Sequence, residues 1–299
     1  MPKFGRLLTA MVTPFDEKGE VDYAQARKLA RALIKSGSDG LVVSGTTGET
    51  PTLTTDEKLR LFAEVKAELG GQGTVIAGTG NYNTRESIEL TKEAEKLGVD
   101  GCLLVVPYYN RPTQEGMFRH FSAIAEATSL PCIMYNVPSR TSSNLAAETV
   151  VRLSKVPNIV AVKEASANFR QISEIIQGVP EGFLVYSGND GDTFPLMAMG
   201  GYGVVGVITH LVGVQTKDMM NKLLAGKVAE AAAIHRRLLP LVDAMFLVAN
   251  PIPLKYAMNQ LGFRVGPTRL PLCEPDEKTA ATILATLKKH TIDLPVPAA

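Results

Sequence analysis

Lys163 is the residue whose type and position most clearly suggest chemistry. It lies in the segment IVAVKEAS, residues 159–166, which begins with four apolar residues and is typical of a buried strand. Because side chains alternate along a strand, we expect Lys163 to share a face with Ile159 and Ala161, with the two valines on the opposite face. An amine that points into the fold near an open end could be neutral near pH 7 and attack a carbonyl to form a Schiff base. The alternative is a lysine held in a buried ion pair.

A second candidate is the turn SGTTGE, Ser44–Glu49, which follows an apolar run. Its glycines let the backbone approach a ligand closely, and its amide groups and the hydroxyls of Thr46 and Thr47 suit a carboxylate. No GK[ST] sequence follows, so the turn is not a phosphate-binding P-loop. The same residues could also form only a tight connection between a strand and a helix.

Other polar residues follow apolar runs in the same way. Tyr135 ends the run CIMY, and its phenol could exchange protons with a substrate, although tyrosine is also common in the cores of sheets. Arg140 comes soon after and could bind a carboxylate through its planar guanidinium group, or simply be solvated. Tyr108–Asn110 and Ser187–Asp190 end two further runs.

The elements that carry these residues alternate along the chain. Eight short, β-rich apolar runs are separated by amphipathic helical patterns, and they cover residues 7–15, 40–45, 74–80, 101–107, 131–138, 159–166, 183–190 and 203–208. Near-continuous apolar strands joined by helices indicate a parallel sheet covered by those helices. Eight such units predict a (β/α)₈ TIM barrel, in which active sites lie at the C-terminal ends of the strands. The candidate residues all lie at those ends.

The chain after residue 224 has a different pattern. Segments 227–248, 251–262 and 277–290 each have helical periodicity, and no further strand is predicted. We therefore expect a catalytic barrel over residues 1–224 and an all-helical C-terminal domain over residues 225–299. A doubly wound open sheet is the alternative fold, but the first strand is followed by TPFDEKGE and not by the glycine-rich GxGxxG turn of that fold.

Composition excludes several kinds of partner. The formal net charge is +1 without a basic or acidic block, so nucleic acid and anionic membrane surfaces are not expected to bind. No segment has the pattern of a signal peptide or a transmembrane helix. The three cysteines form no CxxC pair and favour a reducing cytoplasm. The four histidines form no HxH or HExxH motif, so no metal site is predicted.

Four motifs, in this order and spacing, resemble those of the dihydrodipicolinate synthase family. They are SGTTGET, PYYNRPTQEG, YNVPSRT and VKEAS, and the similarity extends from Gly5 through the terminal helices. This family belongs to the pyruvate-dependent class I aldolase group that includes N-acetylneuraminate lyase. The resemblance implies that Lys163 forms a Schiff base with pyruvate and that Tyr135 exchanges protons at the imine. It also implies a hydroxyl relay from Tyr135 through Thr46 to Tyr109, with Tyr109 supplied by a neighbouring subunit.

The resemblance further implies a reaction and its binding residues. Thr47 and the backbone at Val205 would hold pyruvate, Arg140 would hold the carboxylate of L-aspartate 4-semialdehyde, and Gly188 would shape the pocket wall. The expected product is 4-hydroxy-tetrahydrodipicolinate, on the diaminopimelate route to lysine. No metal or organic cofactor is expected, and the implied assembly is a homotetramer built as a dimer of dimers.

Three other functions remain open at this point. A sister lyase for N-acetylneuraminate or a 2-keto-3-deoxy sugar acid would share the lysine and the tyrosine, but Arg140 and the KEAS sequence favour the synthase. A pyridoxal-phosphate enzyme would also use a lysine, but the sequence has no separate phosphate-binding glycine loop. A catalytically inactive pyruvate sensor would not need the predicted proton relay.

Some members of the family are inhibited by lysine, and four residues here correspond to that allosteric site. Tyr108 and Glu86 are kept. Thr55 and Lys58 stand where histidines are expected, and Tyr82 stands where asparagine is expected. Lys58 could be only a solvated helix residue, but an ammonium group repels a cationic ligand, so these departures from the family pattern predict weak or absent feedback inhibition.

Overall fold

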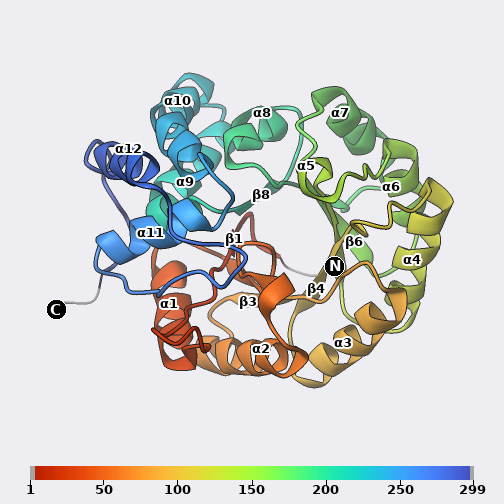
Figure 1. The fold of residues 1–299 in the computed structure, drawn as a ribbon. Coiled ribbons are helices and arrows are strands. Elements are labelled where there is room, and N and C mark those ends of the chain that lie inside the picture. Colours follow the sequence, from red (N-terminus) through yellow and green to blue (C-terminus); the bar gives the residue numbers. More distant parts are fainter. Residues whose placement is uncertain (1–3, 297–299) are drawn as a thin grey trace.

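The computed structural model describes residues 4–296. Its eight strands form a closed, all-parallel barrel in which each strand pairs with its neighbours in chain order and β1 pairs with β8. The strands are β1 (Leu7–Ala10), β2 (Gly40–Val43), β3 (Thr74–Gly78), β4 (Gly101–Val105), β5 (Cys132–Asn136), β6 (Ile159–Glu164), β7 (Leu184–Ser187) and β8 (Gly203–Gly206). Each predicted apolar run contributes one strand, so the predicted (β/α)₈ barrel is confirmed (Figure 1).

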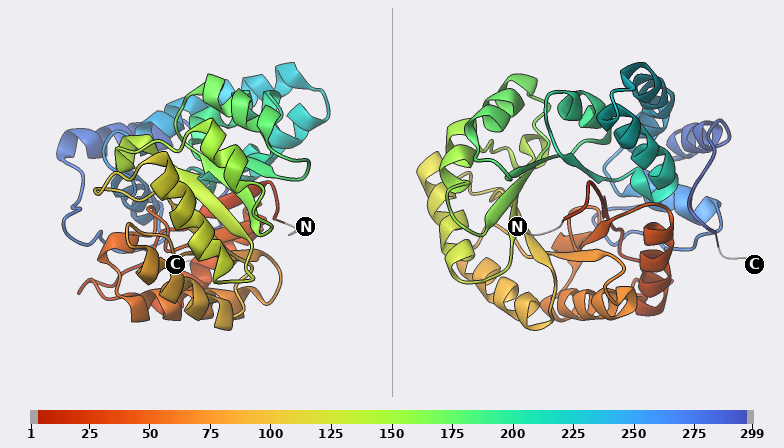
Figure 2. Two further views of the ribbon diagram at one scale, coloured as in Figure 1. Left: turned by 90° about the vertical axis from the view of Figure 1, so that its right-hand side faces the viewer. Right: turned by 180° about the vertical axis from the view of Figure 1, so that it is seen from behind.

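Helices surround the barrel as a ring, which Figure 2 shows from the side and from behind. They are α1 (Tyr23–Lys35), α2 (Thr55–Leu69), α3 (Thr84–Lys96), α4 (Gln114–Glu126), α5 (Pro138–Thr141), α6 (Ala147–Leu153), α7 (Phe169–Gly178), α8 (Thr193–Ala198) and α9 (Thr209–Leu224). Local sequence sets their ends. Thr54 and Glu57 form a capping box at the start of α2, and the helix ends at Gly70, whose φ of 51° is left-handed.

The alternation of side chains separates the inside of the barrel from its helix-facing side. Tyr135, Ala161 and Val205 lie in the interior cluster, whereas Val162 packs outward against the helices. The prediction is wrong for Ile159, which also packs outward, and for Val160, which packs against the interior cluster. The cause is an irregularity in the pairing of β5 with β6, where consecutive residues of β5 pair with Ile159 and Ala161 and one residue of β6 is left over.

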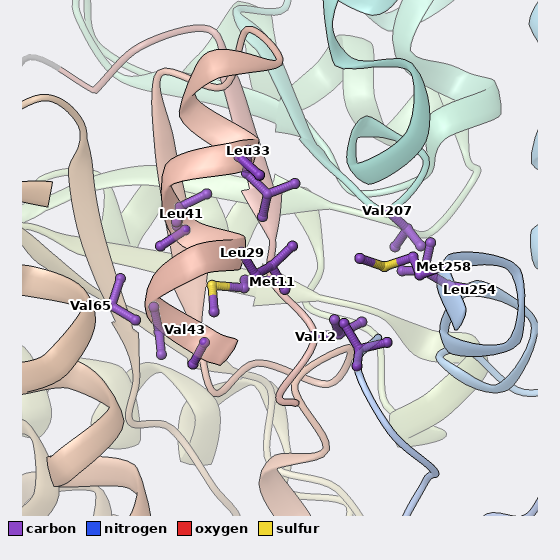
Figure 3. Close-up of a cluster of buried hydrophobic side chains, with 14 of the residues drawn as sticks. Met11, Val12, Leu29, Leu33, Leu41, Val43, Val65, Val207, Leu254 and Met258 are labelled. Carbon is purple, nitrogen blue, oxygen red and sulfur yellow. The ribbon is translucent and has the colours of Figure 1, made fainter. Parts of the chain in front are cut away.

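Three helices follow the barrel, as predicted: α10 (Val228–Met245), α11 (Ile252–Gln260) and α12 (Glu277–Leu287). They lie outside the ring on the side of α1 and α9 (Figures 1 and 2). Figure 3 shows Leu254 and Met258 of α11 among side chains of the barrel, including Val12 and Val207. Because a buried side chain of this size contributes about 1.5–3 kcal/mol, this shared core fixes α11 to the barrel. The boundary expected at residues 224 and 225 falls in the turn between α9 and α10.

Candidate active site

Lys163 and Tyr135 lie side by side at the C-terminal ends of β6 and β5. They are register partners, so their side chains project from the same face of the sheet into the barrel. The Nζ atom of Lys163 lies 4.0 Å from the centre of the Tyr135 ring. Lys163 is only 5% exposed, and Tyr135 is equally buried. The sequence predicted both residues, and the fold brings them into contact.

The Lys163 amine has no polar partner. Within residues 4–296 its side chain forms no ion pair and no hydrogen bond, and its Nζ atom lies over the ring of Tyr135. A buried ammonium group normally has an anionic or hydrogen-bonding partner. The ion-pair alternative for Lys163 is therefore wrong for the described residues.

A buried carboxylate on the outer side of β6 holds this pair of strands in place. Glu164 pairs in register with Asn136, whose Nδ2 atom donates to both carboxylate oxygens at 3.1 Å. The backbone N–H of Ser166 donates to the same carboxylate at 2.7 Å, and Gln171 donates at 3.3 Å. Burial raises the pKa of Glu164, and these hydrogen bonds oppose that effect. The network joins the strand ends that carry Tyr135 and Lys163, and our sequence analysis gave it no role.

Gly188 and Val205 border the same space. A Cβ atom at Gly188 would lie 3.1 Å from Cγ and 3.2 Å from Cε of Lys163, so a larger residue would press on the lysine. Val205 is fully buried in the interior cluster. The carboxylate of Asp190, another residue without a predicted role, accepts a hydrogen bond of 3.0 Å from the backbone N–H of Val207. Burial raises the pKa of Asp190 to about 6, and its bonds to backbone N–H groups and the charge of Lys163 oppose that shift.

The turn Ser44–Glu49 connects β2 to the next helix at the same end of the barrel. Thr47 is buried, and Thr46 is half-buried. The turn is closed by a hydrogen bond from Glu49 N–H to the Thr46 carbonyl at 3.0 Å, and the Thr13 hydroxyl donates to the Gly48 carbonyl at 2.7 Å. Glu49 has a left-handed φ of 57°. The hydroxyl oxygen of Thr47 accepts a hydrogen bond of 2.8 Å from Nδ2 of Asn250.

Two predicted site residues lie outside this cluster. Tyr109 has a positive φ of 71° and is 94% exposed, and Arg140 is exposed on α5. In the part of the chain that the structure describes, Tyr135, Thr46 and Tyr109 are not joined by hydrogen bonds. A single chain therefore does not form the relay that the resemblance implies.

The four residues of the expected lysine site do come together. Lys58, Tyr82, Glu86 and Tyr108 line a cavity of about 200 Å³. The rings of Tyr82 and Tyr108 meet edge to face with their centres 5.1 Å apart. Burial lowers the pKa of Lys58, and the carboxylate of Glu86 opposes that shift.

Another large cavity lies at the opposite end of the barrel from Lys163. A cavity of about 410 Å³ is lined by Asn158–Val160 and Gly182–Phe183, at the N-terminal side of β6 and β7, where TIM barrels do not carry their active sites. Over the described range, 4–296, three or more His, Cys, Asp or Glu residues do not gather as metal ligands would. None of the helices in that range is both long and apolar enough to span a membrane.

The fold and the site together define the class of protein: a TIM barrel with a buried, unpaired lysine beside a tyrosine at the catalytic end of the barrel. This is the arrangement required of a lysine-dependent carbonyl enzyme. The chain belongs to the Dihydrodipicolinate synthetase family, whose model matches residues 3–290.

Individual relatives are similar over almost their whole length. A 4-hydroxy-tetrahydrodipicolinate synthase of Dehalococcoides mccartyi is 60% identical over 296 residues, which are 99% of this chain and 100% of the relative. A dihydrodipicolinate synthase of Cyanidioschyzon merolae, solved with lysine bound, is 46% identical with a TM-score of 0.94, covering 96% of this chain and 98% of that one. A chloride-inhibited dihydrodipicolinate synthase of Acinetobacter baumannii, solved in complex with pyruvate, is 36% identical with a TM-score of 0.93, covering 96% and 99%.

Proposed function

We propose that the protein is a 4-hydroxy-tetrahydrodipicolinate synthase, a lyase that condenses pyruvate with L-aspartate 4-semialdehyde. The observation that carries the proposal is the buried Lys163 amine, which has no ion-pair partner and lies against Tyr135. The high identity to synthases over the full chain supports this choice of reaction. The product would enter the diaminopimelate route to lysine.

In this mechanism the neutral amine of Lys163 attacks C2 of pyruvate, and loss of water leaves an imine. In this proposal Tyr135, whose ring lies against the amine, donates and accepts the protons of these steps. The imine withdraws electrons, so a methyl proton of pyruvate is lost and an enamine forms. The enamine carbon attacks the aldehyde of aspartate semialdehyde. The amine of that substrate then displaces Lys163 by transimination and closes the ring, so the mechanism needs no metal or organic cofactor.

The remaining site residues bind the two substrates in this proposal. Thr47 and the backbone at Val205 hold the carboxylate of pyruvate, and both residues are buried at the end of the barrel. Arg140 is exposed and forms no ion pair within the described residues, which leaves its guanidinium group free for the carboxylate of the second substrate. The absence of a side chain at Gly188 leaves room beside Lys163.

We further propose that the relay is completed between subunits of a homotetramer built as a dimer of dimers. A tyrosine that is 94% exposed, on backbone with a positive φ, is suited to enter a neighbouring site. In this arrangement Tyr109 of one subunit would reach Thr46 and Tyr135 of another. Residues 1–224 would provide the catalytic barrel, and residues 225–299 would form the helical domain.

A cytoplasmic location fits the state of the cysteines. The chain has three cysteines, an odd number with no CxxC pair, which is not the pattern of a disulfide framework. We therefore propose that the protein works in the reducing cytoplasm.

Steady-state kinetics test the proposal against its rivals. The purified enzyme should consume pyruvate and aspartate semialdehyde with kcat/KM of at least about 10⁴ M⁻¹s⁻¹. Under the same conditions it should cleave N-acetylneuraminate and 2-keto-3-deoxygluconate far more slowly. Faster cleavage of either sugar acid would identify a sister lyase, and binding of pyruvate without any turnover would identify an inactive sensor.

A further inference from the structure

We propose that Asn250, which lies in the C-terminal region, is a positioning residue that aims the Thr47 hydroxyl at the carboxylate of pyruvate. This inference rests on the proposed function, because it assigns Thr47 to pyruvate binding. It makes the C-terminal region a part of the substrate site as well as a structural extension of the barrel.

The contact spans most of the chain. Nδ2 of Asn250 donates a hydrogen bond of 2.8 Å to Oγ1 of Thr47, although the residues are 203 positions apart. Asn250 lies between α10 and α11 and is only 5% exposed, and Thr47 is buried as well. Water therefore competes little with this hydrogen bond, and the two side chains hold each other in place.

The direction of the hydrogen bond determines what Thr47 can do. A hydroxyl group has one proton to donate and can accept hydrogen bonds on its oxygen. Because Asn250 donates to that oxygen, the proton of Thr47 is left to donate elsewhere, and a carboxylate accepts such a bond. A residue that accepted at position 250 would instead take the Thr47 proton away from the substrate.

The side-chain amide of Asn250 uses its N–H group but not its carbonyl oxygen in hydrogen bonds. Its Oδ1 atom is buried and has no hydrogen-bond partner within residues 4–296. A buried acceptor without a partner is unfavourable, whereas an apolar residue of similar shape, such as leucine, would avoid that penalty. Packing alone therefore does not explain why position 250 is an asparagine. The hydrogen bond that its N–H group donates to Thr47 explains it.

A separate set of contacts anchors the turn itself. Lys255 donates to one carboxylate oxygen of Glu49 at 2.9 Å, and the backbone N–H of Arg269 donates to the other at 2.9 Å. Thr13 also holds the carbonyl of Gly48. Because these contacts do not involve Asn250, a change at Asn250 should alter the direction of the Thr47 hydroxyl and leave the turn in place.

Two substitutions in the full-length enzyme test the proposal. Asn250→Leu removes the donor, and Asn250→Asp keeps the shape but replaces the donor with an anionic acceptor. The readout is the pyruvate concentration that gives half-maximal borohydride trapping, which does not depend on aspartate semialdehyde. We expect an increase of about tenfold for the leucine variant and a larger increase for the aspartate variant. The KM for aspartate semialdehyde should change less than twofold or so.

A double substitution identifies the route of the effect. If Asn250 acts only through Thr47, then Asn250→Leu should add nothing in a Thr47→Val background. The matched control is Asn259→Leu, because within the described residues the side chain of Asn259 bonds only to the backbone of Val265 and Gly266, in the same C-terminal region. That variant should lower the melting temperature without changing the half-saturating pyruvate concentration.

The outcomes separate this inference from the proposed function. Absence of trapping in the wild-type enzyme would overturn the proposed function itself. Normal trapping in the wild type, with unchanged half-saturation in the aspartate variant or full additivity in the double variant, would overturn the role of Asn250 alone. If the leucine variant fails to fold, the isosteric aspartate variant decides the question.

Discussion

Lys163 and Lys255 are the two buried lysines among residues 4–296, and they differ in their hydrogen bonds. Lys163 in the barrel is 5% exposed and lies 4.0 Å from the centre of the Tyr135 ring. Lys255 in α11 is 2% exposed and lies 4.2 Å from the centre of the Phe15 ring. Burial and an aromatic neighbour are therefore common to both and cannot distinguish a reactive lysine from a structural one.

The difference lies in their hydrogen bonds. Lys255 donates to the carbonyls of Thr13 at 3.0 Å and Pro267 at 2.6 Å, and to the Glu49 carboxylate at 2.9 Å. Burial lowers the pKa of Lys255 to about 8, while Glu49 favours the charged form. All three donors of its ammonium group are thus engaged, whereas within the described residues those of Lys163 are not. We therefore propose that unused hydrogen-bonding capacity, and not burial, distinguishes the reactive lysine from the structural one.

The largest expected effect separates the two lysines by chemistry. Lys163→Arg should lower turnover by more than about 10⁴-fold, because arginine stays protonated and cannot form the imine. The melting temperature should stay close to that of the wild-type enzyme. If the variant kept about a tenth of the wild-type kcat, the Lys163 amine would not be needed for turnover, and its assignment as the nucleophile would be wrong.

The second effect should appear in stability and not in chemistry. Lys255→Met removes the ion-pair partner of the buried Glu49 carboxylate and should lower the free energy of unfolding by about 3–5 kcal/mol. Urea unfolding measures this loss. The folded fraction should still form an imine with pyruvate.

A second substitution provides the control for Lys255. Adding Glu49→Gln should recover part of the lost stability, because the unpaired charge is then removed. Loss of imine formation in folded Lys255→Met protein would instead mean that Lys255 takes part in the reaction.

Arg140 extends the comparison to a residue on the surface. Its guanidinium group also has no ion-pair partner within the described residues, and the same reasoning assigns it to a substrate carboxylate. Arg140→Ala should lower kcat/KM for aspartate semialdehyde by more than tenfold, because a hydrogen bond between charged groups contributes about 1.5–3 kcal/mol. Imine formation with pyruvate should be nearly unchanged. Kinetics with each substrate varied in turn measure both steps. Equal losses in the two steps would show that Arg140 is structural.

The smallest expected effect concerns Lys58 and inhibition of the enzyme by free lysine. It is half-buried in the cavity with Glu86, Tyr82 and Tyr108, where a cationic ligand would meet its ammonium group. Repulsion between like charges at 4 Å is about 1 kcal/mol in water and about 4 kcal/mol at an intermediate dielectric. We therefore expect free lysine to inhibit only above roughly 1 mM. A coupled assay across a lysine titration checks this, and stronger inhibition would mean that the site tolerates Lys58 and Tyr82.

The sequence was sufficient to predict the barrel because local patterns determine most of it. The eight strands and three terminal helices follow from apolar periodicity, and the capping box at Thr54 is read from adjacent residues. Lys163 was found because a charged residue interrupts an apolar run. These features depend on neighbours in sequence, which a single chain displays directly.

What could not be predicted depends on neighbours in space. The irregular pairing that turns Ile159 outward is set by β5, and the bond from Asn250 to Thr47 joins distant segments. The Glu164 network likewise brings together residues from several elements. No local pattern marks these contacts, because packing of the folded chain creates them.

The most direct test of the account asks which buried lysine reacts. The protein is incubated with pyruvate and borohydride, digested, and analysed by peptide mass spectrometry. We expect one reduced pyruvyl group per chain, on the peptide that contains Lys163, and none on the peptide that contains Lys255. Labelling of Lys255, or of another lysine in place of Lys163, would contradict the claim that the unpaired amine in the barrel is the nucleophile.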